Sequence, residues 1–239
     1  MFDKFTKNYN EILNKSIEVT GCNTSDLINA KLLKLRDINP SLINKTINFL
    51  DYGCGTGNLC ENFHYYFPKA HFFGVDISSE MVNEARKKYH SRGTFYEINS
   101  LEWKNKSYDL IFSAGVFHHI LPQFQSDIIK KLSNLMSDSG RLIIWEHNPF
   151  NPVTRKIVKE CPFDKDAILI SPKKIKNLLI QNSLYSVKII YTSFFPKYLN
   201  FLFYLERYLE HFPLGAQYVV IGNKEPIDKI SHPNTLLLM

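Results

Sequence analysis

The chain alternates between short apolar runs and longer stretches in which apolar residues recur three and four positions apart. Short runs of this kind are typical of buried strands, and the longer spacing is typical of helices that bury one face. Strands are predicted at residues 47–52, 71–75, 95–98, 108–113 and 141–145, and helices at residues 59–67, 80–89 and 125–136. Such an alternation predicts crossover units and a mainly parallel α/β sheet with helices on both faces.

Further elements are predicted on either side of this central part. Residues 3–17 and 25–38 have helical spacing and form a leading helical cap, residues 1–40. Helices begin near Asn151-Pro152 and Ser171-Pro172, where an N-cap residue precedes a proline. Two more strands, residues 187–192 and 217–221, flank an aromatic helical stretch at residues 199–212. Because the sequence contains no evident linker, we expect one domain over residues 1–239. Residues 194–214 are expected to form an aromatic insertion near the substrate side of this domain.

Composition narrows the classes of function. The chain has 239 residues, 44% of them hydrophobic, which is enough for one large core. The formal net charge is +6, but the lysines are dispersed, so we expect no nucleic-acid partner. We also expect no secretory signal and no transmembrane segment, because no apolar run of the required kind is present. The four cysteines lack disulfide or zinc-ligand spacing, which favours a cytoplasmic protein without a metal ion.

A glycine-rich turn follows the first buried strand. Gly53, Gly55 and Gly57 stand at alternate positions directly after it. In a doubly wound sheet the backbone approaches a nucleotide-like ligand at this place, and glycine permits the approach because it has no side chain. Glycines with this spacing also occur in ordinary tight turns, so the position after a buried strand is what indicates a ligand site.

An acidic residue, Asp76, ends the next predicted strand. A carboxylate there can accept hydrogen bonds from both hydroxyls of a ribose, although capping the helix that starts near Ser78 is its alternative role. Nicotinamide-binding domains share the glycine turn and the acidic residue. Their fingerprint requires a third small residue where this chain has Asn58, which disfavours a dehydrogenase.

With these motifs, residues 49–145 resemble the class I S-adenosylmethionine-dependent methyltransferase family. The polar and aromatic residues 145–155 resemble a motif in a subgroup of bacterial small-molecule methyltransferases. The resemblance implies a Rossmann-like, doubly wound, seven-stranded sheet with an antiparallel final strand, and S-adenosyl-L-methionine as cofactor. Asn99 stands where the family often has an aspartate against the adenine, and Tyr9 resembles a tyrosine that covers the cofactor. The resemblance assigns cofactor contacts to Tyr9, Asp51, Gly53, Gly55, Gly57, Asp76, Ile77, Asn99, Ser100, Ser113 and Gly115.

Candidates for the chemistry follow the fourth and fifth predicted strands. Methyl transfer from a sulfonium requires alignment and exclusion of water, and it requires a base only if the acceptor must lose a proton. His118 is a candidate base, although His118 and His119 could merely pack beside the following turn. Glu146 and His147 have no evident local role, so we expect them to contact the acceptor.

The expected function is methyl transfer to a small-molecule acceptor, at a hydroxyl oxygen. The acceptor pocket is expected to be enclosed by Glu146 and His147 on one side and by Phe201 and Tyr204 on another. Two alternatives stay open: a cofactor-binding regulatory or interaction protein with this fold, and a nucleic-acid methyltransferase. The second is disfavoured because the fourth strand lacks the Asp/Asn-Pro-Pro-aromatic signature of amino-directed enzymes. The oligomeric state cannot be predicted.

Overall fold

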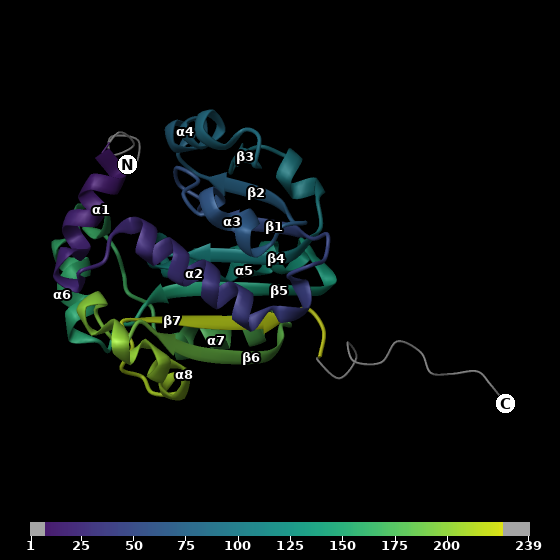
Figure 1. Ribbon diagram of the computed structural model, residues 1–239. Coiled ribbons are helices and arrows are strands. Elements are labelled where there is room, and N and C mark those ends of the chain that lie inside the picture. The colour runs from purple at the N-terminus through teal and green to yellow at the C-terminus, as the bar shows by residue number, and fades with distance from the viewer. Residues whose placement is uncertain (1–7, 227–239) are drawn as a thin grey trace.

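The strands of the chain assemble into a single sheet. The computed structural model describes residues 8–226, except for the side chain of Tyr9. The strands are β1 (Asn48–Tyr52), β2 (His71–Asp76), β3 (Gly93–Glu97), β4 (Tyr108–Ala114), β5 (Met136–His147), β6 (Tyr185–Thr192) and β7 (Gln217–Asn223). Within residues 8–226 they form a seven-stranded sheet in the order β3-β2-β1-β4-β5-β7-β6 (Figure 1). Neighbours from β3 to β5 are parallel, whereas β7 is antiparallel to β5 and β6. The predicted fold class is confirmed.

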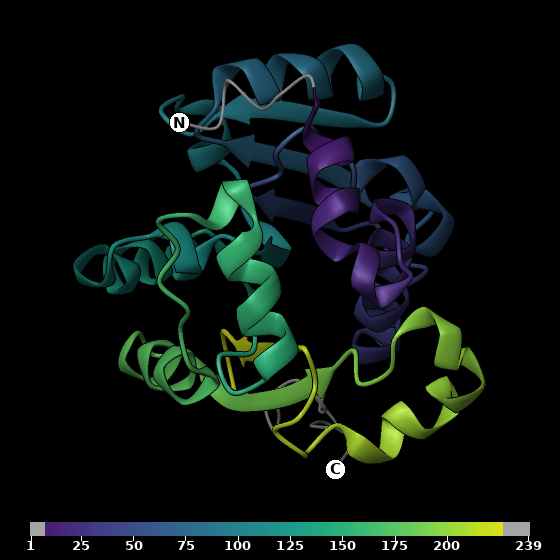
Figure 2. The ribbon, with the colours of Figure 1, turned by 90° about the vertical axis from the view of Figure 1, so that its left-hand side faces the viewer.

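Helices cover both faces of the sheet (Figure 2). They are α1 (Tyr9–Ile17), α2 (Thr24–Ile38), α3 (Cys60–Tyr66), α4 (Ser79–Tyr89), α5 (Pro122–Asn134), α6 (Pro152–Glu160), α7 (Pro172–Gln181) and α8 (Glu206–Leu209). Each face has its own core: Phe63 of α3 belongs to one and Leu179 of α7 to the other. Neighbouring residues of β5 enter opposite cores, Ile143 the first and Leu142 the second, as the alternation of side chains along a strand requires.

The two predicted N-caps are present at the starts of α6 and α7. The side chain of Asn151 accepts a hydrogen bond from the amide of Thr154 at 2.9 Å, and Pro152 is the first residue of α6. Ser171 does the same for Lys174 at 3.3 Å at the start of α7. Proline suits the first turn because its missing amide would have no partner there. This cap starts α6 at Pro152, shortly after β5 ends at His147.

One edge of the sheet collects the ends of the parallel strands and the start of β7. Strand β1 lies between β2 and β4, so the direction of strand succession reverses there. Ligands bind at such a switch point, beyond the carboxyl ends of the strands. His147, the last residue of β5, is opposite Gln217, the first residue of β7, and Gln217 is also opposite Thr192 of β6. The antiparallel β7 therefore closes the same edge.

The aromatic segment, residues 194–214, contains less regular helix than predicted. It consists of a 3₁₀ helix, η7 (Lys197–Leu205), followed by α8. Leu199 departs from helical geometry with φ −106°. The carboxylate of Glu206 accepts the amide of Phe194 at 2.9 Å, so the start of the segment folds back onto its end. Within residues 8–226 the structure has no helix with the length and apolar character needed to cross a membrane.

Candidate active site

The glycine turn is held against the end of β2. The amide of Gly53 donates a hydrogen bond to the carbonyl of Val75 at 2.8 Å. Gly53 has φ +83°, and a Cβ atom on it would lie 2.3 Å from Cγ2 of Val116, so only glycine fits. Gly57 serves a different purpose, because its Cβ would lie 2.9 Å from the Cβ of Ala85 in α4. The third glycine therefore permits close helix packing, behind the ligand site.

Asp76, the last residue of β2, forms a hydrogen bond with the glycine turn. Its Oδ2 accepts the amide of Gly55 at 2.8 Å, and its Oδ1 accepts the amide of Ser78 at 2.9 Å. The N-cap of α4 is Ser78 itself, whose hydroxyl accepts the amide of Met81. A carboxylate oxygen can accept more than one hydrogen bond, so Asp76 keeps the capacity to bind a ribose.

Asp51 of β1 and Lys31 of α2 interact electrostatically next to the turn. Asp51 is buried, and burial raises its pKa to about 7 although the nearby Lys31 opposes the shift. Lys31 projects from α2; burial lowers its pKa, against the effects of Asp51 and Glu146. Sequence reasoning missed Lys31. Its spacing from Ile28 and Leu35, which pack in the core, was the available signal that it faces inward.

The opposite wall is built around a buried carboxylate, Glu146. Its Oε1 accepts the amides of Val116 and Phe117 at 3.0 and 2.7 Å, and its Oε2 lies 2.6 Å from Nδ1 of His118. Nε2 of His118 lies 3.2 Å from Oδ1 of Asp164. Glu146 thus has a clear local role, and the expectation that it lacked one is wrong. It holds the turn after β4 and orients a histidine.

Two carboxylates decide the charge of His118. Burial alone would lower the pKa of His118, but Glu146 and Asp164 outweigh it and raise the pKa to about 10. Burial would raise the pKa of Glu146, but the His118 charge holds it below its usual range. With both ring nitrogens engaged, His118 is a positioning group in this state and has no site to accept a proton.

His147 and His119 flank His118 with different surroundings. The His147 ring centroid lies 5.2 Å from that of His118, and burial together with the His118 charge lowers the pKa of His147 to about 4. Within the described part of the chain, the His147 ring forms no hydrogen bond. Nε2 of His119 lies 3.3 Å from Oδ1 of Asp164, and its ring centroid is 4.1 Å from that of His118. His147 is therefore the neutral ring with nitrogens available.

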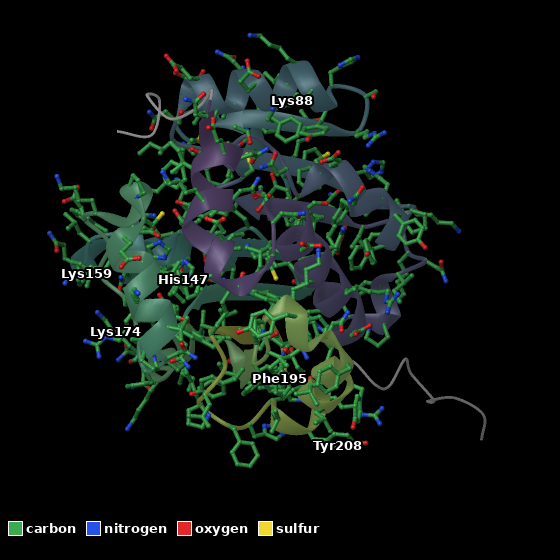
Figure 3. All side chains as sticks on the ribbon, turned by 60° about the vertical axis from the view of Figure 1, so that its left-hand side comes forward. Lys88, His147, Lys159, Lys174, Phe195 and Tyr208 are labelled. Carbon is green, nitrogen blue, oxygen red and sulfur yellow. The ribbon has the colours of Figure 1, made fainter. Side chains whose placement is uncertain are left out.

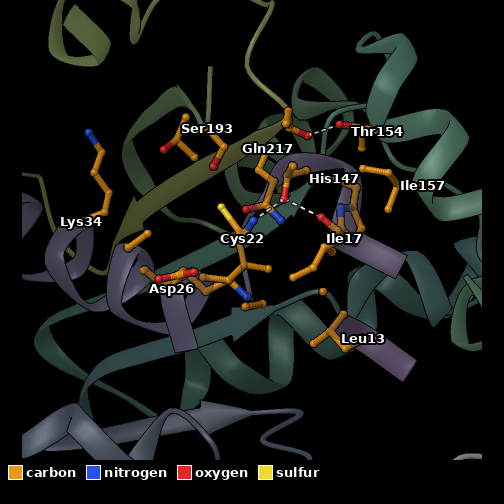
Figure 4. A pocket seen from close by; sticks show the side chains of 18 of the residues that line it. Leu13, Ile17, Cys22, Asp26, Lys34, His147, Thr154, Ile157, Ser193 and Gln217 are labelled. Atoms are coloured by element: carbon orange, nitrogen blue, oxygen red, sulfur yellow. Dashed lines mark hydrogen bonds between the residues drawn. The ribbon is translucent and has the colours of Figure 1, made fainter. Parts of the chain in front are cut away.

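A cavity of 1130 Å³ joins the glycine turn to the histidine wall. Figure 4 shows His147 and Gln217 beside Thr154 of α6 and Ile17 of α1. Of the predicted site residues, the cavity is lined by Gly53, Gly55, Asp76, Ile77, Gly115, His118 and His147. The leading cap, α6 and the aromatic segment close it from outside the sheet.

Other predicted residues lie outside this lining. Asp51, Gly57, Ser113 and Glu146 are behind it, and Ser100 is not part of it. Asn99 is exposed, and the neighbouring Ile98 lines the cavity instead. Tyr9 begins α1, but its side chain lies outside the described residues. Asp164, which the sequence did not single out, lines the cavity from η6 (Pro162–Asp164).

The aromatic segment lines the cavity through residues other than those expected. Phe194, Phe195 and Phe203 line it, and Figure 3 shows Phe195 in this segment with Tyr208 farther out. Phe201 and Tyr204 are each 65% exposed and do not line it, so the prediction that they enclose the pocket is wrong. Phe201 and Tyr204 lie three positions apart and so share one face of the 3₁₀ helix, which at these two positions points away from the cavity.

Known proteins are similar to parts of this chain in sequence. The family described as a methyltransferase domain matches residues 43–186. Malonyl-[acyl-carrier protein] O-methyltransferase of Bacillus anthracis is 29% identical over 102 residues, which are 42% of this chain and 37% of the relative. Trans-aconitate 2-methyltransferase of Afipia carboxidovorans is 31% identical over 98 residues, 39% of this chain and 36% of the relative. The chain therefore spans less than half the length of these relatives.

A solved structure extends the likeness of fold to most of the chain. An S-adenosylmethionine-dependent methyltransferase from Archaeoglobus fulgidus has a TM-score of 0.61 at 17% identity, covering 82% of this chain and 94% of that one. The family match spans more than half of the 239 residues and contains the glycine turn, Asp76 and the histidine wall. The chain belongs to the class I S-adenosylmethionine-dependent methyltransferase family.

Proposed function

We propose that this chain transfers the methyl group of S-adenosylmethionine to a hydroxyl oxygen of a small-molecule acceptor bound in the cavity. The continuity of the cavity carries the proposal, because one space touches Gly53 and Asp76 on one side and His118 and His147 on the other. A cofactor with its ribose on Asp76 and its methionine end near Gly115 would present its methyl group to this space.

Different residues serve the cofactor and the acceptor. Asp76 accepts hydrogen bonds from the ribose hydroxyls, and the apolar side chains of Ile77 and Ile98 flank the adenine. His147 acts on the acceptor hydroxyl, because its ring is neutral and its nitrogens are available. As the oxygen–methyl bond forms and the carbon–sulfur bond breaks, the hydroxyl proton passes to a ring nitrogen of His147, and S-adenosylhomocysteine leaves. His118 and Glu146 position the wall that carries His147.

One observation supports an oxygen acceptor, and a second supports a small organic molecule. One relative is named as an O-methyltransferase, and its matched part is 29% identical to this chain. The apolar rings of Phe194, Phe195 and Phe203 line the same cavity as His147. Such a surface excludes water from a small organic acceptor and leaves few polar groups to orient it.

Methyl-labelled S-adenosylmethionine tests the proposal. The full chain is incubated with panels of alcohols, phenols, carboxylates and amines, and nuclear magnetic resonance identifies the methylated atom. We expect label on a hydroxyl oxygen. His147→Asn should lower the transfer rate roughly 100-fold, as loss of proton-transfer assistance does, while leaving cofactor affinity unchanged. His71→Asn, an exposed histidine at the start of β2, is the matched control.

Three outcomes would contradict this assignment. Label on nitrogen or carbon would exclude the hydroxyl acceptor. Tight binding of S-adenosylhomocysteine without transfer to any panel or cell extract would favour a regulatory protein with this fold. Wild-type rates in His147→Asn would remove His147 from the chemistry.

A further inference from the structure

We propose that His118, His147 and Asp164 bind one divalent transition-metal ion, such as Zn²⁺, at the histidine wall of the cavity. One ligand atom from each of these side chains lies within 4.8 Å of the other two. The residues come from η5 (Phe117–His119), the end of β5 and η6. Because these elements are far apart in the sequence, no ligand spacing along the chain could reveal the set.

The donor types suit such an ion. Two imidazoles and one carboxylate form a common three-ligand set for Zn²⁺ and related ions, and this set leaves coordination positions open. Ligands around a tetrahedral ion lie roughly 3.3–3.6 Å apart. Nε2 of His118 and Oδ1 of Asp164 already lie 3.2 Å apart. His147 is the ligand that must approach, and no hydrogen bond within residues 8–226 holds its ring back.

A second carboxylate orients the first ligand. Oε2 of Glu146 lies 2.6 Å from Nδ1 of His118, while its Oε1 is fixed by the amides of Val116 and Phe117. A metal-binding histidine usually donates its other ring N–H to a carboxylate, which fixes the tautomer and directs the remaining nitrogen at the ion. Glu146 directs Nε2 of His118 toward Asp164 in this way.

Charge also favours a cation at this place. Glu146 and Asp164 bring two negative charges to a wall on which the His118 side chain is only 1% exposed. A divalent ion between neutral imidazoles would balance the two carboxylates by taking the place of the proton between His118 and Asp164. Lys31 also interacts electrostatically with Glu146. Its single positive charge is smaller than the two negative charges of Glu146 and Asp164, which attract the ion.

The ion would extend the role of His147 in methyl transfer. His118, His147 and Asp164 all line the cavity, so the open coordination positions would face the acceptor. An oxygen bound to the ion loses its proton more readily, which prepares a hydroxyl for attack on the methyl group. This step rests on the proposed function, whereas the metal site does not.

Metal binding can be measured without cofactor or acceptor. The full chain is freed of metal with a chelator and titrated with Zn²⁺ by calorimetry, and then with Co²⁺ while the visible spectrum is recorded. We expect one ion per chain and the intense ligand-field bands of Co²⁺ in a low-coordinate nitrogen and oxygen site. No saturable binding, or only the weak spectrum of hydrated Co²⁺, would overturn the proposal.

Matched variants locate the ion. His147→Gln and Asp164→Asn should each lower Zn²⁺ affinity at least tenfold, and His71→Gln should leave it unchanged. Binding of S-adenosylhomocysteine to each variant shows that the fold is intact. Wild-type Zn²⁺ affinity in His147→Gln and Asp164→Asn would place the ion elsewhere and reject the site. Methyl transfer that depends on His147 without any metal binding would reject the ion and leave the proposed function standing.

Discussion

At the scale of single residues, two carboxylates near the cavity, Asp76 and Glu146, each accept hydrogen bonds from two backbone amides. Asp76 binds the amides of Gly55 and Ser78, and Glu146 binds two amides after β4. Such local bonds fix the carboxylates before any ligand arrives, so little ordering remains to be done on binding. Asp51 and Glu146 are both buried behind the cavity lining, but the cation that acts on Asp51 is Lys31, whereas Glu146 contacts His118.

Asp76→Ala should weaken S-adenosylhomocysteine binding about tenfold or more, because hydrogen bonds to a charged group contribute roughly 1.5–3 kcal/mol. Calorimetry measures the change. Glu97→Ala is the matched control, since Glu97 is an exposed carboxylate at the end of the neighbouring β3. An affinity within about twofold of the wild type would remove Asp76 from the cofactor site.

Asp51→Asn tests the cost of a buried charge. Burial raises the folded-state pKa of Asp51 to about 7, above its unfolded value of about 3.9. Between these pH values the folded chain keeps a proton that the unfolded chain releases, so the free energy of unfolding falls as pH rises. Asp51→Asn removes the ionisable group, so its free energy of unfolding does not fall in this way. The variant should therefore be more stable than the wild type near pH 8, by roughly 2–4 kcal/mol.

Denaturant unfolding at about pH 5 and pH 8 checks the sign of this difference. The gain should be clearly larger at the higher pH, because most of the ionisation cost arises between the two. Asp138→Asn, at an exposed position of β5, should show no such gain. A gain in Asp51→Asn that is equal at both pH values would show that Asp51 is ionised throughout.

At the scale of elements, the sheet could be predicted closely because its strands are buried apolar runs. The predicted strand at residues 71–75 is β2 (His71–Asp76), and that at residues 108–113 is β4 (Tyr108–Ala114). The aromatic segment was less predictable. Its apolar residues outnumber the positions that can be buried, so periodicity could not separate Phe195 from Phe201.

The active site was predictable where its residues lie on sequence motifs and unpredictable where tertiary structure assembles it. The glycine turn and Asp76 follow strands in a recognisable order. Lys31 and Asp164 reach the cavity from α2 and η6, and only the folded chain brings them to the wall near Glu146. Their neighbours in space are remote in sequence.

Phe195→Ala should raise the KM for the acceptor several-fold with little effect on cofactor affinity, because an apolar wall of the cavity is lost. Phe201→Ala removes the same side chain from a position that is 65% exposed and outside the cavity, and it should leave KM unchanged. Steady-state kinetics with the acceptor identified from the panels measures both. Equal effects of the two substitutions would show that the segment acts only through stability.

At the scale of the whole molecule, the cavity lies between several parts of the chain. The sheet edge, the leading cap, α6 and the aromatic segment all contribute to its walls. A ligand that fills this space contacts several elements at once and binds only when they are assembled. Ligand binding should therefore stabilise the whole fold against unfolding.

S-adenosylhomocysteine at about 100 times its Kd should stabilise the chain by roughly 2.7 kcal/mol, which a thermal scan records as a higher Tm. NAD at the same concentration should give no shift, because Asn58 replaces the small residue of the dinucleotide fingerprint. Asp76→Ala should show a reduced shift with S-adenosylhomocysteine. A larger Tm shift with NAD than with S-adenosylhomocysteine would favour a dehydrogenase instead.

The walls of the cavity differ in whether the family match covers them. The family match covers residues 43–186, which include the glycine turn, Asp76 and the histidine wall, whereas Lys31, Phe195 and Gln217 line the cavity from outside that range. The family match therefore covers all of the proposed donor site but only part of the proposed acceptor wall. We expect exchange of Phe195 or Gln217 to change which acceptors the cavity admits while the methyl donor stays the same.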